Sequence, residues 1–136
     1  MIAFHPEAAE GVDQTIRLIE QHDCQVGLVI NPDTDIACLT ETLLDRLDAI
    51  TMMSVYPGFG GQKFIPDVLE KIKVVRALIK DRPIALEVDG GIKVDNITEV
   101  ARAGANRFVA GSAIFHSENY QQTIAQLREA IAVDHH

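Results

Sequence analysis

The stretch that decides the fold is Val26-Gly27-Leu28-Val29-Ile30 (VGLVI), an unbroken apolar run between two polar segments. A run of this length and composition is typical of a strand in a parallel sheet that is covered on its outer face. Four similar runs occur along the chain, so that the expected strands are Ile2–Phe4, Val26–Ile30, Ala49–Val55, Ile84–Val88 and Arg107–Ala110. They begin about 23 to 35 residues apart, which leaves room for a helix and two loops between successive strands.

The segments between these runs carry apolar residues at helical spacing. The stripes are Val12, Ile16 and Ile19; Leu39, Leu43 and Leu47; Val68, Ile72, Val75 and Ile79; and Ile124, Leu127 and Ile131. The second helix is expected to begin near Ile36, and a short helix is expected to run from a cap at Asn96 to Ala103. The spacing of Lys71, Lys73, Arg76 and Lys80 places them on the solvated side of the third helix.

This alternation predicts the α/β class, with a parallel sheet in a single domain that spans residues 1–136. Five such units fit either an open doubly wound sheet or part of a (β/α)8 barrel. A whole barrel typically takes about 250 residues, so barrel material of this length would be roughly three units short.

Composition and charge exclude several classes of protein. The formal net charge is −8 and the sequence shows no basic face, so a nucleic-acid partner is not expected. No apolar run approaches the ~20 residues of a membrane-spanning helix, and the N-terminus does not resemble a secretory signal. Cys24 and Cys38 do not make a disulfide framework, and reduced thiols in a cytoplasmic protein are expected.

Three of the expected strands are followed by glycines: Pro57-Gly58-Phe59-Gly60-Gly61, Asp89-Gly90-Gly91 and Gly111-Ser112-Ala113-Ile114-Phe115. Ligands of parallel α/β sheets bind at the carboxyl ends of the strands, where bare backbone amides can approach an anion. A plain turn would explain any one of these loops. Three such loops in consecutive units favour a site for a phosphorylated ligand.

Asp89 ends a hydrophobic strand, which places a carboxylate at the mouth of a barrel site, where its pKa can be tuned. A turn-forming or helix-capping aspartate is the alternative on local pattern. The direction of Glu87 stays open. The spacing of His and Cys residues contains no complete metal site.

The strings FHPEA (from Phe4), MSVYPGFGGQKF (from Met53), LEVDGGI (from Leu86) and AGANRFVAGSAIF (to Phe115) occur in this order. Together they resemble the ribulose-phosphate 3-epimerase family, from Phe4 to about Ala132. The resemblance implies a (β/α)8 barrel that interconverts ribulose 5-phosphate and xylulose 5-phosphate. This chain is then expected to supply strands 4–8 with their helices, the C-terminal portion of a phosphate-binding barrel, without the first three units.

The resemblance also implies roles for individual residues. Asp89 matches an aspartate that serves as a metal ligand and as one of two acid/base carboxylates, and Met53 matches a methionine that lines the pocket. The substrate and phosphate would contact Gly58, Phe59, Gly60, Gly61, Gly90, Gly91, Gly111 and Ser112. The implied cofactor is one divalent ion, Zn, Fe, Mn or Co, whose other ligands lie in the missing units, so the metal site is expected to be incomplete here.

Three functions stay open at this point. The first is epimerisation of ribulose 5-phosphate, with activity impaired or lost in this chain alone. The second is epimerisation of a ketohexose 6-phosphate, since Tyr56 stands where the family has a smaller polar residue. The third is a non-catalytic module for phosphosugar binding or assembly. An incomplete barrel has two open sheet edges, so the expected partners are a phosphorylated ketose and either a second copy or a complementary fragment.

Overall fold

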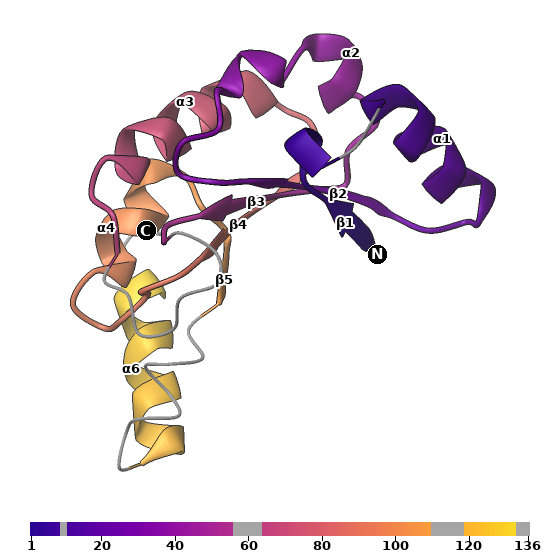
Figure 1. Cartoon of the computed structure of the whole chain (residues 1–136). Coiled ribbons are helices and arrows are strands. Elements are labelled where there is room, and N and C mark those ends of the chain that lie inside the picture. The colour runs from indigo at the N-terminus through magenta and orange to yellow at the C-terminus, as the bar shows by residue number, and fades with distance from the viewer. Residues whose placement is uncertain (9–10, 56–63, 110–118, 133–136) are drawn as a thin grey trace.

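The computed structural model describes residues 1–8, 11–55, 64–109 and 119–132. Its centre is a parallel sheet of five strands in the order β1-β2-β3-β4-β5 (Figure 1). The strands are β1 (Ile2–Phe4), β2 (Val26–Ile30), β3 (Ala49–Met53), β4 (Ala85–Asp89) and β5 (Arg107–Val109). The predicted α/β class and parallel sheet are confirmed, and each strand overlaps a run that the sequence indicated. Two bounds differ: β3 ends at Met53 rather than Val55, and β4 is shifted by one residue and ends at Asp89 rather than Val88.

The helices follow the strands in turn. They are η1 (Pro6–Ala8), α1 (Val12–Gln21), η2 (Ile36–Cys38), α2 (Glu41–Leu44), α3 (Val68–Ile79), α4 (Ile97–Ala103) and α6 (Tyr120–Ala132). The prediction of one helix from Ile36 is wrong, because the chain breaks at Thr40, which is extended. The Thr40 hydroxyl accepts a hydrogen bond from the Leu43 amide at 3.2 Å and so starts a separate helix.

The strand order decides between the two sheet types that the sequence left open. A doubly wound sheet reverses its order at one point, and that reversal places helices on both faces. Here the order is sequential throughout, and Figure 1 shows the helices along one side of a curved sheet. Sequential right-handed crossovers produce this arrangement, which is that of a barrel segment.

The core lies between the sheet and these helices. Strand residues at alternate positions point into it and are at most 1% exposed: Leu28, Ile30, Ile50, Met52, Leu86 and Val88. They form one cluster with the predicted helical stripes, including Ile16, Ile72 and Val75. The predicted helical stripes therefore face the sheet.

The opposite face of the sheet carries a mixture of small, polar and apolar side chains. Thr51, Glu87 and Asp89 lie on it, each half-buried, with Ala49 beside them. Among the described helices, none covers this face in Figure 1. In a closed barrel this is the face that points inward.

Two of the four basic residues predicted to be solvated, Lys71 and Arg76, are half-buried and bond to backbone carbonyl groups. Lys71 Nζ donates to the carbonyl oxygens of Pro32 and Thr34 at 2.6 and 2.7 Å. Arg76 Nε donates to the Gly104 carbonyl at 2.8 Å. Both side chains tie a loop to α3, because long cationic side chains can bury their stems while the charged end finds carbonyl groups.

The two cysteines are free and half-buried, as predicted. Burial is the main cause that raises the pKa of the Cys38 thiol. In the part of the chain that the structure describes, none of the helices has the length and apolar character needed to cross a membrane.

Candidate functional site

The carboxyl ends of the last three strands meet at one edge of the sheet. Met53 at the end of β3 is paired in register with Asp89 at the end of β4, and Asp89 is paired with Val109 at the end of β5. Parallel pairing alone brings these positions together, since all the strands run in the same direction. This edge is where barrel proteins bind their ligands.

Asp89 and Glu87 lie two residues apart in β4 and therefore share the inward face. Glu87 Oε2 accepts a hydrogen bond from the Thr51 hydroxyl at 2.7 Å, which fixes the direction that the sequence left open. Burial raises the pKa of the Asp89 carboxyl, and the nearby Glu87 charge raises it further. A half-buried carboxylate with a raised pKa, at a strand end, is suited to proton transfer.

The turn after Asp89 has a backbone shape that requires glycine. Gly90 and Gly91 have φ angles of +121° and +69°. A Cβ added to Gly90 would lie 2.6 Å from Cγ2 of Val55. The turn therefore packs directly against Val55, which follows Ser54 just beyond the end of β3. Asn96 Nδ2 donates to the Gly91 carbonyl at 2.8 Å and holds the other side of the turn.

Asn96 occupies the predicted cap position of α4, but its side chain does not bond to the first turn of the helix. Its Oδ1 instead accepts from the Lys93 amide at 2.8 Å, while its Nδ2 reaches back to Gly91. Asn96 thus links the start of α4 to the glycine turn, which the sequence alone did not indicate.

Ser54 follows β3, is 0% exposed and joins the same turn from the opposite side. Its amide donates to the Asp89 carbonyl at 2.9 Å, and its hydroxyl lies within hydrogen-bonding distance of the Asp89 and Gly90 carbonyl oxygens. Ser54 was not among the residues predicted for the site. The available signal was a hydroxyl within an apolar run at a buried position, since buried polar groups need partners.

A polar pocket of about 440 Å³ opens beside the glycine turn. Its lining residues are Phe64, Gly91, Lys93, Asp95 and Asn96. Phe64 directly follows residues 56–63, so the pocket lies where the first glycine-rich loop returns to the described chain. Its wall thus includes one basic and one acidic residue, Lys93 and Asp95.

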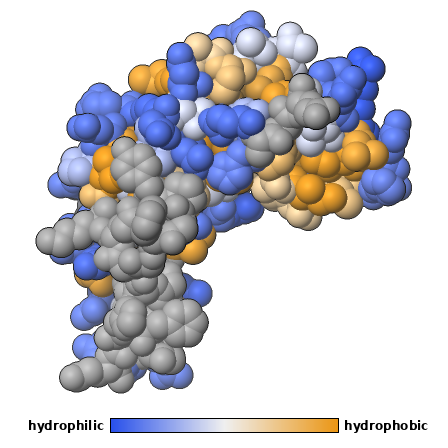
Figure 2. All heavy atoms as spheres, in the orientation of Figure 1, coloured by the Kyte–Doolittle hydropathy of each residue, from blue (hydrophilic) through white to orange (hydrophobic). Residues whose placement is uncertain are grey.

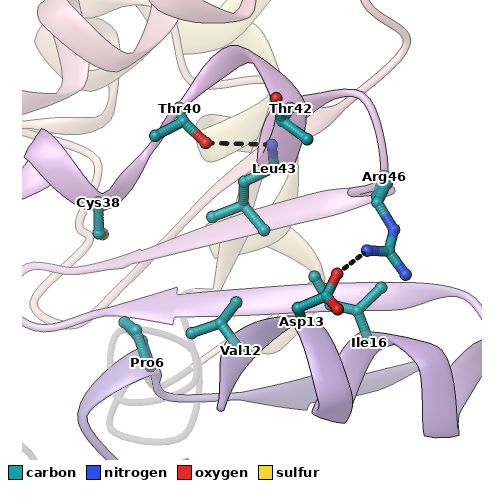
Figure 3. Close-up of a pocket in the computed structure, with 9 residues that line it drawn as sticks. All are labelled: Pro6, Val12, Asp13, Ile16, Cys38, Thr40, Thr42, Leu43 and Arg46. Carbon is teal, nitrogen blue, oxygen red and sulfur yellow. Dashed lines mark hydrogen bonds and ion pairs between the residues drawn. The ribbon is translucent and has the colours of Figure 1, made fainter.

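A second pocket, of about 230 Å³, lies in the helix layer between α1 and α2 (Figure 3). Val12, Ile16 and Leu43 make much of its wall, and Asp13 and Arg46 meet at one end with an Nη1–Oδ1 distance of 2.5 Å. This exposed ion pair and the apolar wall do not combine a half-buried strand-end carboxylate with a glycine turn. The carboxyl edge of β3 and β4 is therefore the better candidate site.

The structure brings together four of the predicted site residues: Asp89, Met53, Gly90 and Gly91. The remaining six, Gly58, Phe59, Gly60, Gly61, Gly111 and Ser112, lie outside the described residues, as do Tyr56 and Ala110. Predictions about their contacts stay predictions.

The described residues do not fit a complete metal site. Within them, three or more His, Cys, Asp or Glu side chains nowhere gather closely enough to hold an ion. Asp89 could contribute one carboxylate ligand, and its neighbour Glu87 is bonded to Thr51.

Solved structures support the architecture. The 3-hexulose-6-phosphate synthase of Salmonella typhimurium superposes with a TM-score of 0.64 over 91% of this chain and 57% of its own, at 21% identity. A structure of the Amycolatopsis orientalis BexX/CysO complex matches with a TM-score of 0.62 over 88% of this chain and 46% of its own, also at 21% identity. At such identities the likeness concerns the fold alone.

Sequence relatives are much closer. Ribulose-phosphate 3-epimerase 2 of Cupriavidus necator is 52% identical over 98% of this chain and 59% of its own length. Ribulose-phosphate 3-epimerase of Serratia marcescens is 57% identical over 89% of this chain and 58% of its own. The Escherichia coli K12 enzyme of that name is 52% identical over 97% of this chain and 59% of its own.

The chain thus spans somewhat under two thirds of the length of these curated relatives. The model of the Ribulose-phosphate 3 epimerase family matches residues 1–115, which include β1 to β5 and the candidate site. The predicted resemblance is confirmed, and the chain belongs to the ribulose-phosphate 3-epimerase family.

Proposed function

We propose that residues 1–136 form one domain, the C-terminal portion of an epimerase barrel, which binds a phosphorylated ketopentose and supplies one of its two acid/base groups. The observation that carries the proposal is the placement of Asp89. Its half-buried carboxyl, with a raised pKa, ends β4 beside a glycine turn and opposite Met53.

The chemistry explains why a carboxylate is needed there. Epimerisation at C3 begins when the hydrogen next to the C2 carbonyl leaves as a proton. The electron pair of the C–H bond moves toward the carbonyl oxygen and gives an ene-diolate. A proton delivered to the opposite face of C3 inverts the centre, so the reaction takes an acid/base group on each face. Asp89 serves one face, and its raised pKa increases its affinity for the proton that it takes.

The glycine turn supports the phosphate part of the proposal. Gly91 lines the adjacent pocket without a Cβ that could block an anion, and Lys93 supplies a basic side chain to the same wall beside Asp95. Gly58, Phe59, Gly60, Gly61, Gly111 and Ser112 are proposed to complete the cradle. Met53, half-buried beside Asp89, is proposed to line the sugar site.

A divalent metal ion, if bound, would stabilise the negative oxygen of the ene-diolate. Asp89 is the one ligand that we propose from this chain. The described residues provide no complete ligand set, so any further ligands would have to come from elsewhere.

Solvent exchange at C3 tests the role of Asp89. The chain is incubated in heavy water with ribulose 5-phosphate and, separately, with xylulose 5-phosphate, with and without added Mn²⁺. With one acid/base group, deuterium is expected to enter the epimer whose C3 hydrogen faces Asp89, without conversion to the other epimer. Asp89→Asn should abolish this exchange while sugar-phosphate binding remains. Exchange that persists in D89N would contradict the assignment.

A second candidate is a binding module without catalysis. It is favoured by the single acid/base carboxylate at the carboxyl edge and by the lack of a metal cluster in the described ranges. Binding of both sugar phosphates without exchange in either would support the module, and failure to bind either would overturn both proposals. Comparison with a ketohexose 6-phosphate in the same assay tests the substrate size. Cytoplasmic location, and self-association or pairing with a complementary fragment, stay predictions.

A further inference from the structure

Ser54 is one of two polar residues in the described ranges that are buried, the other being Thr34. Thr34 lies in the loop after β2, where its hydroxyl bonds to Glu7. Ser54 lies at the candidate site and is 0% exposed. Such burial of a hydroxyl is unfavourable unless its hydrogen bonds are made, so its partners indicate what it is for.

Three segments meet at Ser54. Its amide and hydroxyl hold the carbonyl groups of Asp89 and Gly90, the end of β4 and the start of the glycine turn. Its carbonyl accepts the Ile65 amide at 2.8 Å, where the chain emerges from residues 56–63. Ser54 therefore joins both ends of the first glycine-rich loop to the strand that carries Asp89.

The Ser54 hydroxyl makes a contact with the glycine turn that the Ser54 backbone does not make. It carries one proton, and two carbonyl oxygens lie within its reach, at 3.0 Å for Asp89 and closer still for Gly90. It can therefore bond to either of two consecutive peptide groups, Asp89–Gly90 and Gly90–Gly91, whereas the backbone hydrogen bonds of Ser54 reach Asp89 and Ile65. The hydroxyl is the part of Ser54 that reaches the glycine turn.

We propose that Ser54 is a positioning residue that couples the occupied phosphate turn to Asp89. Anion binding at Gly90 and Gly91 would reach the Asp89 backbone through the shared Ser54 hydroxyl, so that the phosphate of the substrate helps to orient the reacting carboxylate. This inference rests on the proposed function, since it takes that turn as the phosphate site.

The test follows backbone amides of the ¹⁵N-labelled chain by NMR during titration with inorganic phosphate. In the wild-type chain, phosphate should shift the amides of Gly91, Asp89 and Ile65 together. In Ser54→Ala, the affinity should fall about threefold to tenfold, as expected for one lost hydrogen bond, and the Asp89 and Ile65 shifts should shrink at least twofold relative to Gly91. Ser54→Thr, which keeps the hydroxyl, should restore the phosphate affinity and the Asp89 and Ile65 shifts.

Thr34→Val is the matched control, because it also removes a buried hydroxyl and preserves side-chain volume. It should lower the unfolding free energy while the phosphate response stays that of the wild type. If S54A does not fold, Ser54→Cys, which has a similar size and is a weaker donor, replaces it. If S54A and T34V showed the same phosphate affinity and the same amide shifts on titration, the proposal would be overturned.

A second readout does not depend on phosphate. Without ligand, the Gly90 and Gly91 amides of S54A should exchange with heavy water at least tenfold faster relative to the Leu86 amide in the strand, and those of T34V should not. If phosphate fails to bind the wild-type chain, the proposed phosphate site fails. The hydrogen-exchange rates of the Gly90 and Gly91 amides then test by themselves whether Ser54 holds the turn. Unchanged rates in S54A would refute this role.

Discussion

Strand β4 presents two different surfaces within five residues. Leu86 and Val88 point toward the helices and are 0% exposed, whereas Glu87 and Asp89 lie half-buried on the other face. The first pair belongs to a close-packed apolar cluster, and the second pair belongs to a polar surface whose one described side-chain hydrogen bond comes from Thr51. The residues that stabilise the core and the residues of the candidate site thus lie on opposite faces of the same strand. Substitutions on each face can therefore test stability and site function separately.

The largest effect is expected on the helix-covered face. Leu86→Ala leaves a cavity in the core and should lower the unfolding free energy by about 2–5 kcal/mol, or prevent folding. Glu87→Ala, one residue away on the open face, should change it by less than about 1.5 kcal/mol. Urea unfolding followed by circular dichroism measures both. Equal losses would contradict the assignment of the two faces.

A smaller effect on stability is expected at the Gly90–Gly91 turn that follows β4. Gly90→Ala forces a side chain into a backbone with φ of +121° and against Val55, which should lower stability by about 1–3 kcal/mol and weaken phosphate binding. Gly104→Ala is a matched control, since Gly104 has φ of +127° and its added Cβ would lie 2.6 Å from Arg76. The control should lose stability and keep phosphate binding, as isothermal titration would reveal. Loss of binding in both would indicate general unfolding.

A still smaller effect concerns pH. Burial first, and the Glu87 charge second, raise the pKa of Asp89 in the folded chain. The folded chain therefore holds this proton more tightly than the unfolded chain. Its contribution to stability is full below the ordinary aspartate pKa of about 3.9 and is lost as the pH rises through the folded value.

Asp89→Asn removes the titrating carboxyl group. The variant should therefore have a higher unfolding free energy than the wild type at pH 7, and its unfolding free energy should fall less steeply as the pH rises above about 4. Unfolding curves at several pH values check this. A stability loss at pH 7 in D89N would mean that the carboxylate makes a stabilising contact.

The smallest effect on unfolding is expected at the open edge, where self-association should respond instead. Ile2 donates its amide to the Gln25 carbonyl at 2.9 Å, so the next amide, that of Ala3, points away from β2. Figure 2 shows an apolar patch where β1 and α1 lie, and Met1, Ile2 and Leu18 are 56%, 44% and 57% exposed. Ala3→Pro removes an edge donor and should reduce association in sedimentation experiments. An unchanged mass would place the interface elsewhere.

Local patterns predicted most of the fold. The run Val26–Ile30 and the stripe Val68, Ile72, Val75 and Ile79 report directly which side chains leave water, and so they gave strands and helices correctly. The break at Thr40 was missed because Leu39 and Leu47 are both buried despite it. Burial alone does not report whether the backbone between two apolar residues is continuous.

The candidate site was predicted less completely. Asp89, Gly90 and Gly91 could be found because a strand end and a glycine pair are features of adjacent residues. Ser54 and Asn96 act through carbonyl groups on other segments, and no local pattern names such a partner. The same holds for Lys71, whose partners Pro32 and Thr34 lie almost forty positions earlier in the chain.

The sequential strand order has a consequence for motion. Each strand borders only its neighbours along the chain, so local opening should spread inward from the three-residue strands β1 and β5. Strands β3 and β4 would then be the last to fray. Met53 and Asp89 lie on these two strands, which means that the proposed site residues are attached to the stiffest part of a molecule that loosens from its ends.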